Sequence, residues 1–363
     1  MPRVIGIDPG TVSLDLCGLD DGRVFFDESI ATEDALADPS LVLGLLDRAS
    51  PLDLVVGPSG YGLPLTHARE LTERDLRLAC LAPRGESGGI GGLSSLMRAL
   101  ATASVPVLVT PGVVHLQSVP AHRKVNRVDM GTADKVCAAA LAIHDQARRR
   151  SCDVRDVSLI LLELGGAFTA ALAVEQGRIV DGLGGSSGPL GATASGALDG
   201  EVAFLAGQVT KQMMFSGGAL SVAGTPGAPA ETLAEVTTPE RQRALEAYLE
   251  GVVKSVAGLT VSAPSARAVV LSGRLARVGA IRGGLITRLS RVVQGGTVEV
   301  LSGFGGAVAK HAAQGAALLA DGLAGGSAAP LVGALGIREA TGTVLDHLYV
   351  ISPDAARRRL GIE

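Results

Sequence analysis

Hydrophobic and polar positions follow two different periods along the chain, which predicts a mixed α/β protein. Short apolar runs closed by Gly, Thr or Ser are typical of buried strands. Elsewhere apolar side chains recur every three or four positions, which predicts helices that begin after Thr132 and Thr238. An Ala- and Gly-rich helix over 307–323 is expected to pack closely on a neighbour. The apolar runs occupy residues 54–57, 107–109, 268–271 and 298–301.

One unit of this pattern occurs twice. In the first copy an apolar strand ends in Asp8, a glycine follows two positions later, and a second apolar segment leads to the turn at 20–23. In the second copy Glu163 stands where Asp8 does, and the turn is at 175–178. The acidic residue, both glycines and the Arg after the turn fall in the same register, and turns of this kind join hairpin strands. We therefore expect two related domains, each beginning with three antiparallel strands.

The length sets the expected division of the chain. With 363 residues there is room for two domains. We predict an N-terminal domain over 1–150, a C-terminal domain over 151–326 and a C-terminal extension over 327–363. Within the extension, the apolar residues 348–351 could add an edge strand.

Composition limits which binding partners and which cellular compartment are expected for this protein. The chain is 47% hydrophobic, carries a formal net charge of −4 and contains six Phe, three Tyr and no Trp, so no nucleic acid partner is expected. Four widely spaced cysteines are typical of free thiols in a reducing cytosol. An acidic residue stands too early for a secretory signal, and the longest apolar run, 159–174, is too short to cross a membrane. We expect a cytoplasmic protein that does not enter the membrane.

The two acidic glycine turns favour phosphate chemistry. Glycine lets backbone N–H groups approach phosphate oxygens, and a carboxylate at a strand end can hold Mg²⁺ or its water. Two such turns that face a common cleft would hold a polyphosphate from both sides. The chain contains no Gly-Lys dipeptide, which excludes a P-loop. Asp8 and Glu163 are the candidate metal ligands, and a structural role as turn caps is the alternative for both.

These motifs resemble those of the superfamily of acetate and sugar kinases, heat-shock chaperones and actin. The turn at 8–11 is similar to its first phosphate loop, 271–274 to its adenosine loop, and 303–326 to its closing helix with the preceding glycines. Residues 126–135 and 181–199 resemble two stretches of acetate and butyrate kinases. The whole chain resembles a mainly archaeal family sometimes described as predicted butyrate kinases (DUF1464-like).

The resemblance implies a fold, cofactors and residue roles. The fold is two duplicated ribonuclease H-like domains, the actin-like ATPase fold, with a nucleotide cleft between them. ATP and Mg²⁺ are the implied cofactors, Asp181 would orient the acceptor or act as its base, and Arg127 would offset transition-state charge. Residues 56–62 lie where the acid kinases have a cationic substrate segment, and they contain no cation. Nucleotide or phosphate contacts are expected from Gly6, Asp8, Gly10, Thr11, Gly165, Gly166, Thr169, Gly273, Arg274, Gly305 and Gly306.

Two functional hypotheses follow. The first is an ATP- and Mg²⁺-dependent phosphotransferase that acts on a small acceptor, with a short-chain carboxylate as one candidate. The second is an ATP-binding or ATPase regulatory protein of the same superfamily that has no small-molecule kinase activity. Substrate-dependent release of ADP would separate the two. The sequence leaves a homodimer open as the oligomeric state.

Overall fold

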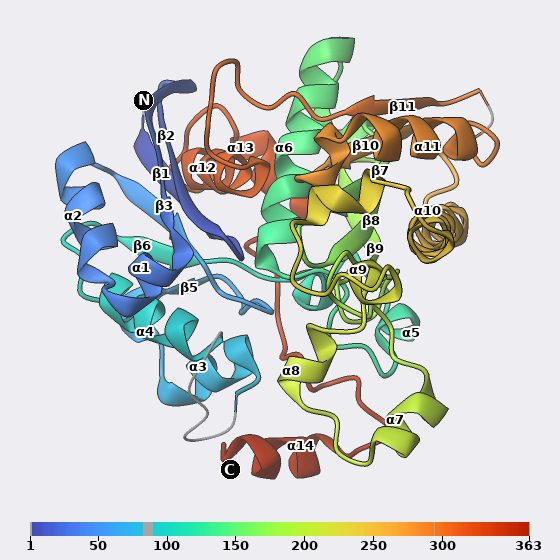
Figure 1. Ribbon diagram of the computed structural model, residues 1–363. Helices are drawn as coiled ribbons and strands as arrows, with labels where there is room; N and C mark the ends of the chain where they lie inside the picture. The colour runs from blue at the N-terminus through green and yellow to red at the C-terminus, as the bar shows by residue number, and fades with distance from the viewer. Residues whose placement is uncertain (1, 83–89, 294, 363) are drawn as a thin grey trace.

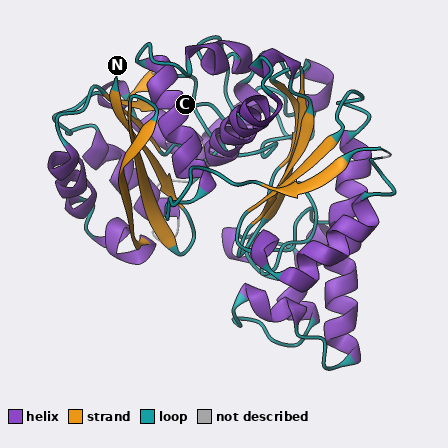
Figure 2. Cartoon of the chain, turned by 90° about the horizontal axis from the view of Figure 1, so that it is seen from above, coloured by secondary structure: helices purple, strands orange, loops and turns teal. Residues whose placement is uncertain are grey.

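A computed structural model describes residues 2–82, 90–293 and 295–362 of the chain. Two β-sheets stand on either side of a central group of helices (Figure 1; Figure 2). The strands are β1 (Arg3–Pro9), β2 (Ser13–Asp20), β3 (Arg23–Ala31), β4 (Leu54–Gly57), β5 (Thr66–His67), β6 (Val107–Val109), β7 (Leu159–Leu164), β8 (Thr169–Glu175), β9 (Arg178–Leu183), β10 (Ala268–Ser272) and β11 (Thr297–Val300). The four apolar runs predicted to be strands are confirmed as β4, β6, β10 and β11.

Helices make up most of the remaining regular structure. Thr132 and Thr238 both stand at the N-cap positions expected from the sequence, and Thr238 accepts a hydrogen bond from Arg241 N. The α-helices are α1 (Thr32–Ala37), α2 (Ser40–Ala49), α3 (Glu73–Cys80), α4 (Ile90–Leu100), α5 (Ala121–Lys124), α6 (Ala133–Arg150), α7 (Gly200–Ala206), α8 (Lys211–Met214), α9 (Ala219–Val222), α10 (Pro239–Leu259), α11 (Gly279–Leu289), α12 (His311–Leu323), α13 (Ala329–Leu335) and α14 (Pro353–Leu360).

The two sheets share one topology, as the sequence repeat predicts. The first has the order β3-β2-β1-β4-β6-β5 and the second the order β11-β10-β7-β8-β9. In each, three antiparallel strands come first in the chain, and the first of them then pairs in parallel with a strand that follows a long crossover. A further parallel strand, β6 or β11, extends the sheet. The expected duplication is confirmed at the level of strand order.

The hairpin details repeat as well. The central turn residues have positive φ in both copies, 51° and 70° at Asp21 and Gly22, and 51° and 73° at Gln176 and Gly177. Two consecutive left-handed residues are what a two-residue type I′ turn requires. Both hairpins also contain a register shift two pairs beyond this turn, between Gly18 and Leu19 and between Ala173 and Val174.

Three layers of apolar side chains hold the sheets and helices together. The inner faces of both sheets contribute to one core with α6 and α12, for example Val4, Leu161 and Leu319. The outer face of the first sheet packs with α1, α2 and α4, and the outer face of the second packs with α10 and α11. Because one core joins both halves, it fixes the positions of the bordering strand ends relative to one another.

Helix α12 follows the second sheet in the chain but packs on the first. A Cβ added at Gly6 of β1 would lie 2.1 Å from Ala317 N of α12, and one added at Gly315 of α12 would lie 1.8 Å from Cys137 O of α6. The close packing expected for this Ala- and Gly-rich helix is confirmed. The domain boundaries drawn from the sequence remain predictions, and α12 itself returns to the N-terminal half.

The C-terminal extension continues around the N-terminal half. The edge strand expected at 348–351 is wrong, because Tyr349 N and Val350 N donate to the Asn126 side chain and pair with no strand. Helix α14 follows, and Arg77 of α3 donates to Leu360 O at 3.3 Å. All four cysteines are free. Within the described part of the chain, no helix combines the length and the apolar character that a bilayer crossing needs.

Candidate functional site

A buried carboxyl group lies at the end of the first strand of the first hairpin. Asp8, at the end of β1, is 6% exposed. Burial raises its pKa from 3.8 to about 7, the carboxylate of Asp134 adds to the increase, and Lys310 and Lys135 oppose it. Asp8 therefore lies in a pocket whose nearest charges are of both signs.

A lysine from the opposite end of the chain covers the turn after Asp8. Lys310, just before α12, lies 2.8 Å from Asp15 Oδ2 and donates to Ser13 O at 2.6 Å. A Cβ added at Gly10 would lie 2.3 Å from Lys310 Nζ, so glycine leaves the space that this ammonium group uses. Thr11, next to Gly10, is exposed. Gly10 N donates to Ser13 O at 3.0 Å, so the turn combines a backbone closed on itself with a fixed positive charge.

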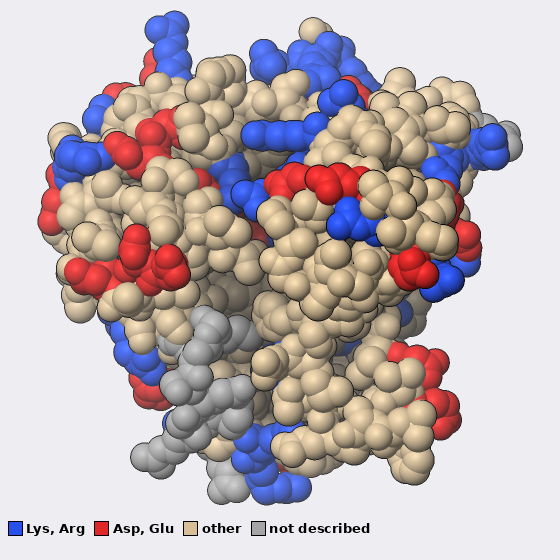
Figure 3. All heavy atoms as spheres, viewed as in Figure 1, with Lys and Arg blue, Asp and Glu red and all other residues tan. Residues whose placement is uncertain are grey.

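The start of α6 joins the two halves of the site. Asp134 accepts a short hydrogen bond from Thr132 and pairs with Lys135. Burial alone would lower the pKa of Lys135, but the carboxylates of Asp134, Glu163 and Asp8 outweigh it and raise the pKa. The start of α12 links the two hairpins directly, because Lys310 bonds at the first turn and the adjacent His311 bonds to Ser272, which lies opposite Glu163. In Figure 3, acidic and basic side chains lie side by side where the two halves meet.

The second hairpin is built by close backbone contacts around Glu163. A Cβ at Gly273 would lie 2.7 Å from Glu163 Oε1, and one at Gly165 would lie 2.7 Å from Phe168 O. Gly166 has Arg274 beside it, with an added Cβ only 3.9 Å from Arg274 Nη1. The Arg274 Nε also lies 3.1 Å from Glu231 Oε1. The second turn is therefore tight and has a half-exposed cation next to it.

A histidine at the start of α12 lies near Glu163. His311, the first residue of α12, shares a 2.7 Å hydrogen bond through Nδ1 with Ser272 Oγ at the end of β10. Burial lowers the pKa of His311, and Glu163 opposes that shift. Lys310 and His311 were both missed as site residues. Their position a few residues after the glycine-rich segment 303–306 was the available signal.

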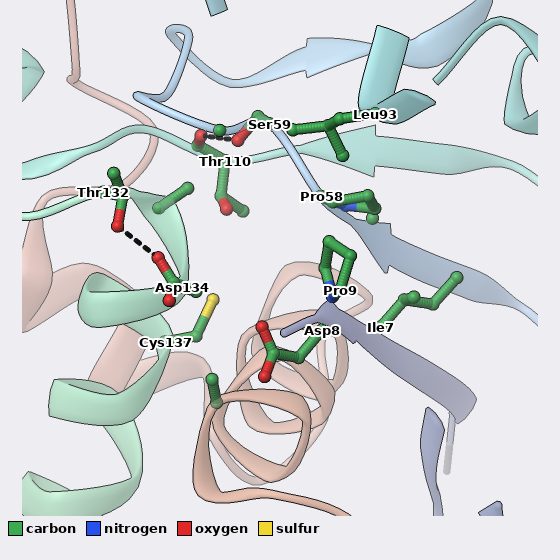
Figure 4. A pocket seen from close by; sticks show the side chains of 14 residues that line it. Ile7, Asp8, Pro9, Pro58, Ser59, Leu93, Thr110, Thr132, Asp134 and Cys137 are labelled. Atoms are coloured by element: carbon green, nitrogen blue, oxygen red, sulfur yellow. Dashed lines mark hydrogen bonds between the residues drawn. The ribbon is translucent and has the colours of Figure 1, made fainter. Parts of the chain in front are cut away.

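A cavity of about 140 Å³ opens between the ends of β1, β4 and β6 and the start of α6 (Figure 4). Asp8, Ser59, Thr110, Asp134 and Cys137 contribute polar atoms to its wall, and Ile7, Pro58 and Leu93 contribute apolar ones. Ser59 donates its hydroxyl to Thr110 O at 2.6 Å. Burial raises the pKa of the Cys137 thiol, which therefore stays neutral. The cavity adjoins Asp8 and so borders the site between the turns.

Asp181 is not brought to this site. On β9 it pairs with Ala173 of β8, which packs in the outer core under α10, whereas Glu163 lies on the inner face of the same sheet with Leu161. The Asp181 carboxylate accepts from Ser262 Oγ at 2.6 Å. The catalytic role expected for Asp181 therefore has no support in the geometry.

The other residues expected at the site have the following contacts in the structure. Arg127 donates to Ser187 O at 3.3 Å. Thr169 is fully buried and donates to Tyr248 OH at 3.3 Å. Gly6 lies under α12, so packing accounts for this glycine. Gly305 and Gly306 lie in the open loop before α12, where an added Cβ meets no atom within 4 Å.

Solved structures identify the class of fold. A propionate kinase from Francisella tularensis subsp. tularensis SCHU S4 is similar over 87% of this chain and 98% of its own, with a TM-score of 0.63 and 13% identity. An acetate kinase from Entamoeba histolytica is similar over 80% and 86%, with a TM-score of 0.58 and 14% identity. A Porphyromonas gingivalis acetate kinase covers 80% and 88% with the same TM-score of 0.58 and 14% identity. The protein therefore has the two-domain, actin-like ATPase fold of the kinase superfamily named above.

Within that class, the family is also defined. The chain belongs to the family described as "Protein of unknown function (DUF1464)", whose model matches residues 6–350. A search of curated proteins gives no match. The expected fold class and family are confirmed, whereas the expected site residues remain predictions.

Proposed function

We propose that the protein is an ATP- and Mg²⁺-dependent phosphotransferase that acts on a small acceptor. The observation that carries the proposal is the start of α12, where Lys310 bonds at the turn after Asp8 and the adjacent His311 bonds to Ser272, opposite Glu163, because it joins the acidic ends of both duplicated hairpins. Phosphoryl transfer depends mainly on positioning and on neutralising charge. A site with two glycine turns and a lysine or arginine beside each turn meets both needs.

The donors present fit a magnesium ion that arrives with a nucleotide. Among the described residues, no three His, Cys, Asp or Glu side chains are arranged to hold a metal. Mg²⁺ usually takes one or two protein carboxylates and completes its shell with water and phosphate oxygens. Asp8 and Glu163 would supply these carboxylates, and the metal would neutralise charge on the phosphates.

The cations and the turns would divide the remaining roles. Lys310 with Gly10 and Thr11 would hold one part of the polyphosphate, and Arg274 with Gly165 and Gly166 the other. Backbone N–H groups of such turns and these side chains are standard phosphate donors. Gly273 would keep the approach to Glu163 open, because any side chain there meets the carboxylate.

Release of ADP in the presence of an acceptor tests the proposal. A coupled assay with Mg-ATP and a panel of small alcohols and carboxylates should show acceptor-dependent ADP release. Asp8→Asn should abolish it, whereas Asp156→Asn, an exposed carboxylate outside the site, should leave it intact. Acceptor-independent ATP hydrolysis, or tight binding without turnover, would favour the regulatory ATPase instead. The names of the structural neighbours suggest a short-chain carboxylate as the acceptor. The residues that line the cavity beside Asp8 allow this suggestion to be examined.

A further inference from the structure

The cavity beside Asp8 has a mostly apolar wall, into which a few hydroxyl and carboxyl groups are set. Its only charged lining groups within the described residues are the carboxyls of Asp8 and Asp134. Neither nearby ammonium group lines this cavity, because Lys135 pairs with Asp134 and Lys310 pairs with Asp15 over the turn at Gly10. A buried carboxylate ligand normally needs an Arg or another fork of donors. Here such a ligand would find no cation in the described wall and would lie beside the Asp134 carboxylate.

The N-terminus of α6 does not reverse this conclusion. Helix N-termini attract anions, and α6 begins at the cavity. Its first turn, however, already carries the Asp134 carboxylate, and Ala133 N donates to Gly60 O at 3.0 Å. The positive end of the helix is thus largely neutralised by the chain's own acid.

A buried hydroxyl that has no partner stronger than a thiol among the described residues points into the same cavity. Thr110 is 1% exposed, and no hydrogen-bond partner of its Oγ1 is found among the described residues. Figure 4 shows this side chain directed between Asp8, Asp134 and Cys137. The Cys137 thiol is near enough to interact with it, but sulfur is a weak partner. Buried polar atoms are rarely left unpaired, so a ligand group that exchanges hydrogen bonds with Thr110 is expected.

We propose that this cavity takes the phosphoryl acceptor, and that the acceptor is a small uncharged compound with hydroxyl groups rather than a carboxylate. The proposal rests on the proposed function. A hydroxyl both donates and accepts, so one group can donate to Asp134 and another can pair with Thr110. Ile7, Pro58 and Leu93 face the carbon skeleton. A dry cavity of about 150 Å³ holds a molecule the size of benzene, so a volume of about 140 Å³ fits a short polyol such as glycerol.

The transfer balances with groups already described. The acceptor oxygen bonds to the γ-phosphorus while the bond from that phosphorus to the β–γ bridging oxygen breaks. ADP leaves with this electron pair, and the hydroxyl proton passes to the Asp134 carboxylate and then to water. No oxidant or further reactant is required.

Three probes with the same number of non-hydrogen atoms test the acceptor class. Glycerol, butane-1,3-diol and butyrate are titrated into the whole protein and followed by ligand-observed NMR. We expect binding of glycerol and the diol, and no binding of butyrate. Butyrate binding equal to or tighter than that of the alcohols would overturn the proposal, as would a failure of all three to bind.

Substitutions at Thr110 assign the binding to this cavity. Thr110→Val keeps the shape and removes the hydroxyl, and should weaken glycerol binding roughly tenfold. Thr110→Ser restores the hydroxyl and should restore binding. Unchanged glycerol binding in Thr110→Val would overturn the assignment, and the wild-type comparison of the three probes decides the acceptor class even if this variant does not fold. Thermal stabilisation of the same samples by Mg-ATP reports separately on the proposed function. If Mg-ATP does not stabilise the wild type, the proposed phosphotransferase is contradicted, whereas glycerol binding to the cavity can still be observed.

Discussion

The two duplicated hairpins carry an acidic residue at the same position, and they differ most in the charged groups around that residue. Asp8 is almost fully buried, and its turn is covered by Lys310, which is anchored on the buried Asp15. The turn after Glu163 instead has Arg274 beside it, which is half-exposed and paired with a half-exposed glutamate. The duplicated backbone therefore has two charge environments that differ in the acidic partner of the cation: a buried Asp15 at the first turn and a half-exposed Glu231 at the second.

The same contrast extends to the strands. Two positions before each acidic residue, the first copy has Gly6 and the second has Leu161. Helix α12 lies directly on β1, so only glycine fits there, whereas Leu161 fills the space between β7 and the central helices. The return of α12 to the first sheet is what makes the copies unequal.

The largest loss of stability should come from placing a side chain between β1 and α12. Gly6→Ala places a methyl group 2.1 Å from the backbone of α12 and should reduce the free energy of unfolding by about 3 kcal/mol or more. Gly44→Ala in α2 meets no atom within 4 Å and should be neutral or stabilising by up to about 1 kcal/mol. Urea denaturation of both variants measures the difference. Equal stabilities would show that α12 is not pressed on β1.

The next effect depends on pH and concerns the buried carboxyl of the first hairpin. Because burial raises the pKa of Asp8 from 3.8 to about 7, the folded state holds a proton that the unfolded chain loses. That contribution to stability is complete below about pH 4 and is lost as the pH rises through 7. Asp8→Asn should therefore exceed the wild type by about 2 kcal/mol at pH 8, with a gap that narrows toward pH 5.

Thermal or urea unfolding across this pH range checks the sign. Asp156→Asn serves as the control and should show no such trend relative to the wild type. A gap that widens as the pH falls would contradict the assigned direction of the Asp8 shift.

A smaller pair of effects compares the cations at the two turns. Lys310→Met leaves the buried Asp15 without its ammonium partner and should cost about 1–2 kcal/mol, since Lys310 is itself 42% exposed. Arg274→Met breaks an exposed pair and should cost about 0.5 kcal/mol or less. Denaturation without nucleotide measures both. A larger loss in Arg274→Met than in Lys310→Met would reverse the comparison.

Local spacing was enough to predict the repeat, because hairpin turns and strand ends depend on neighbouring residues. It failed where the fold brings distant residues together. Lys310 reaches the first turn only because α12 crosses between the halves, and nothing near Gly10 in the sequence indicates a lysine. Thr110 lines the cavity because β6 lies beside β4, a pairing across a long crossover.

The orientation of Asp181 is a second feature that the sequence spacing does not predict. Strict alternation from Ile179, which packs in the inner core, would place Asp181 on the inner face with Glu163. The register shift between Ala173 and Val174 leaves Val180 without an opposite residue and turns Asp181 to the outer face. A single extra residue in a strand thus reverses which face a side chain occupies, and the spacing alone does not reveal it.

The claim that both hairpins hold one nucleotide is tested most directly by thermal unfolding with and without Mg-ATP. A ligand at about a hundred times its Kd adds about 2.7 kcal/mol to stability, which raises the Tm by several degrees. The account predicts this rise for the wild type and for Asp156→Asn, and its loss in both Asp8→Asn and Glu163→Gln. No rise in the wild type, or an undiminished rise in either site variant, would contradict it.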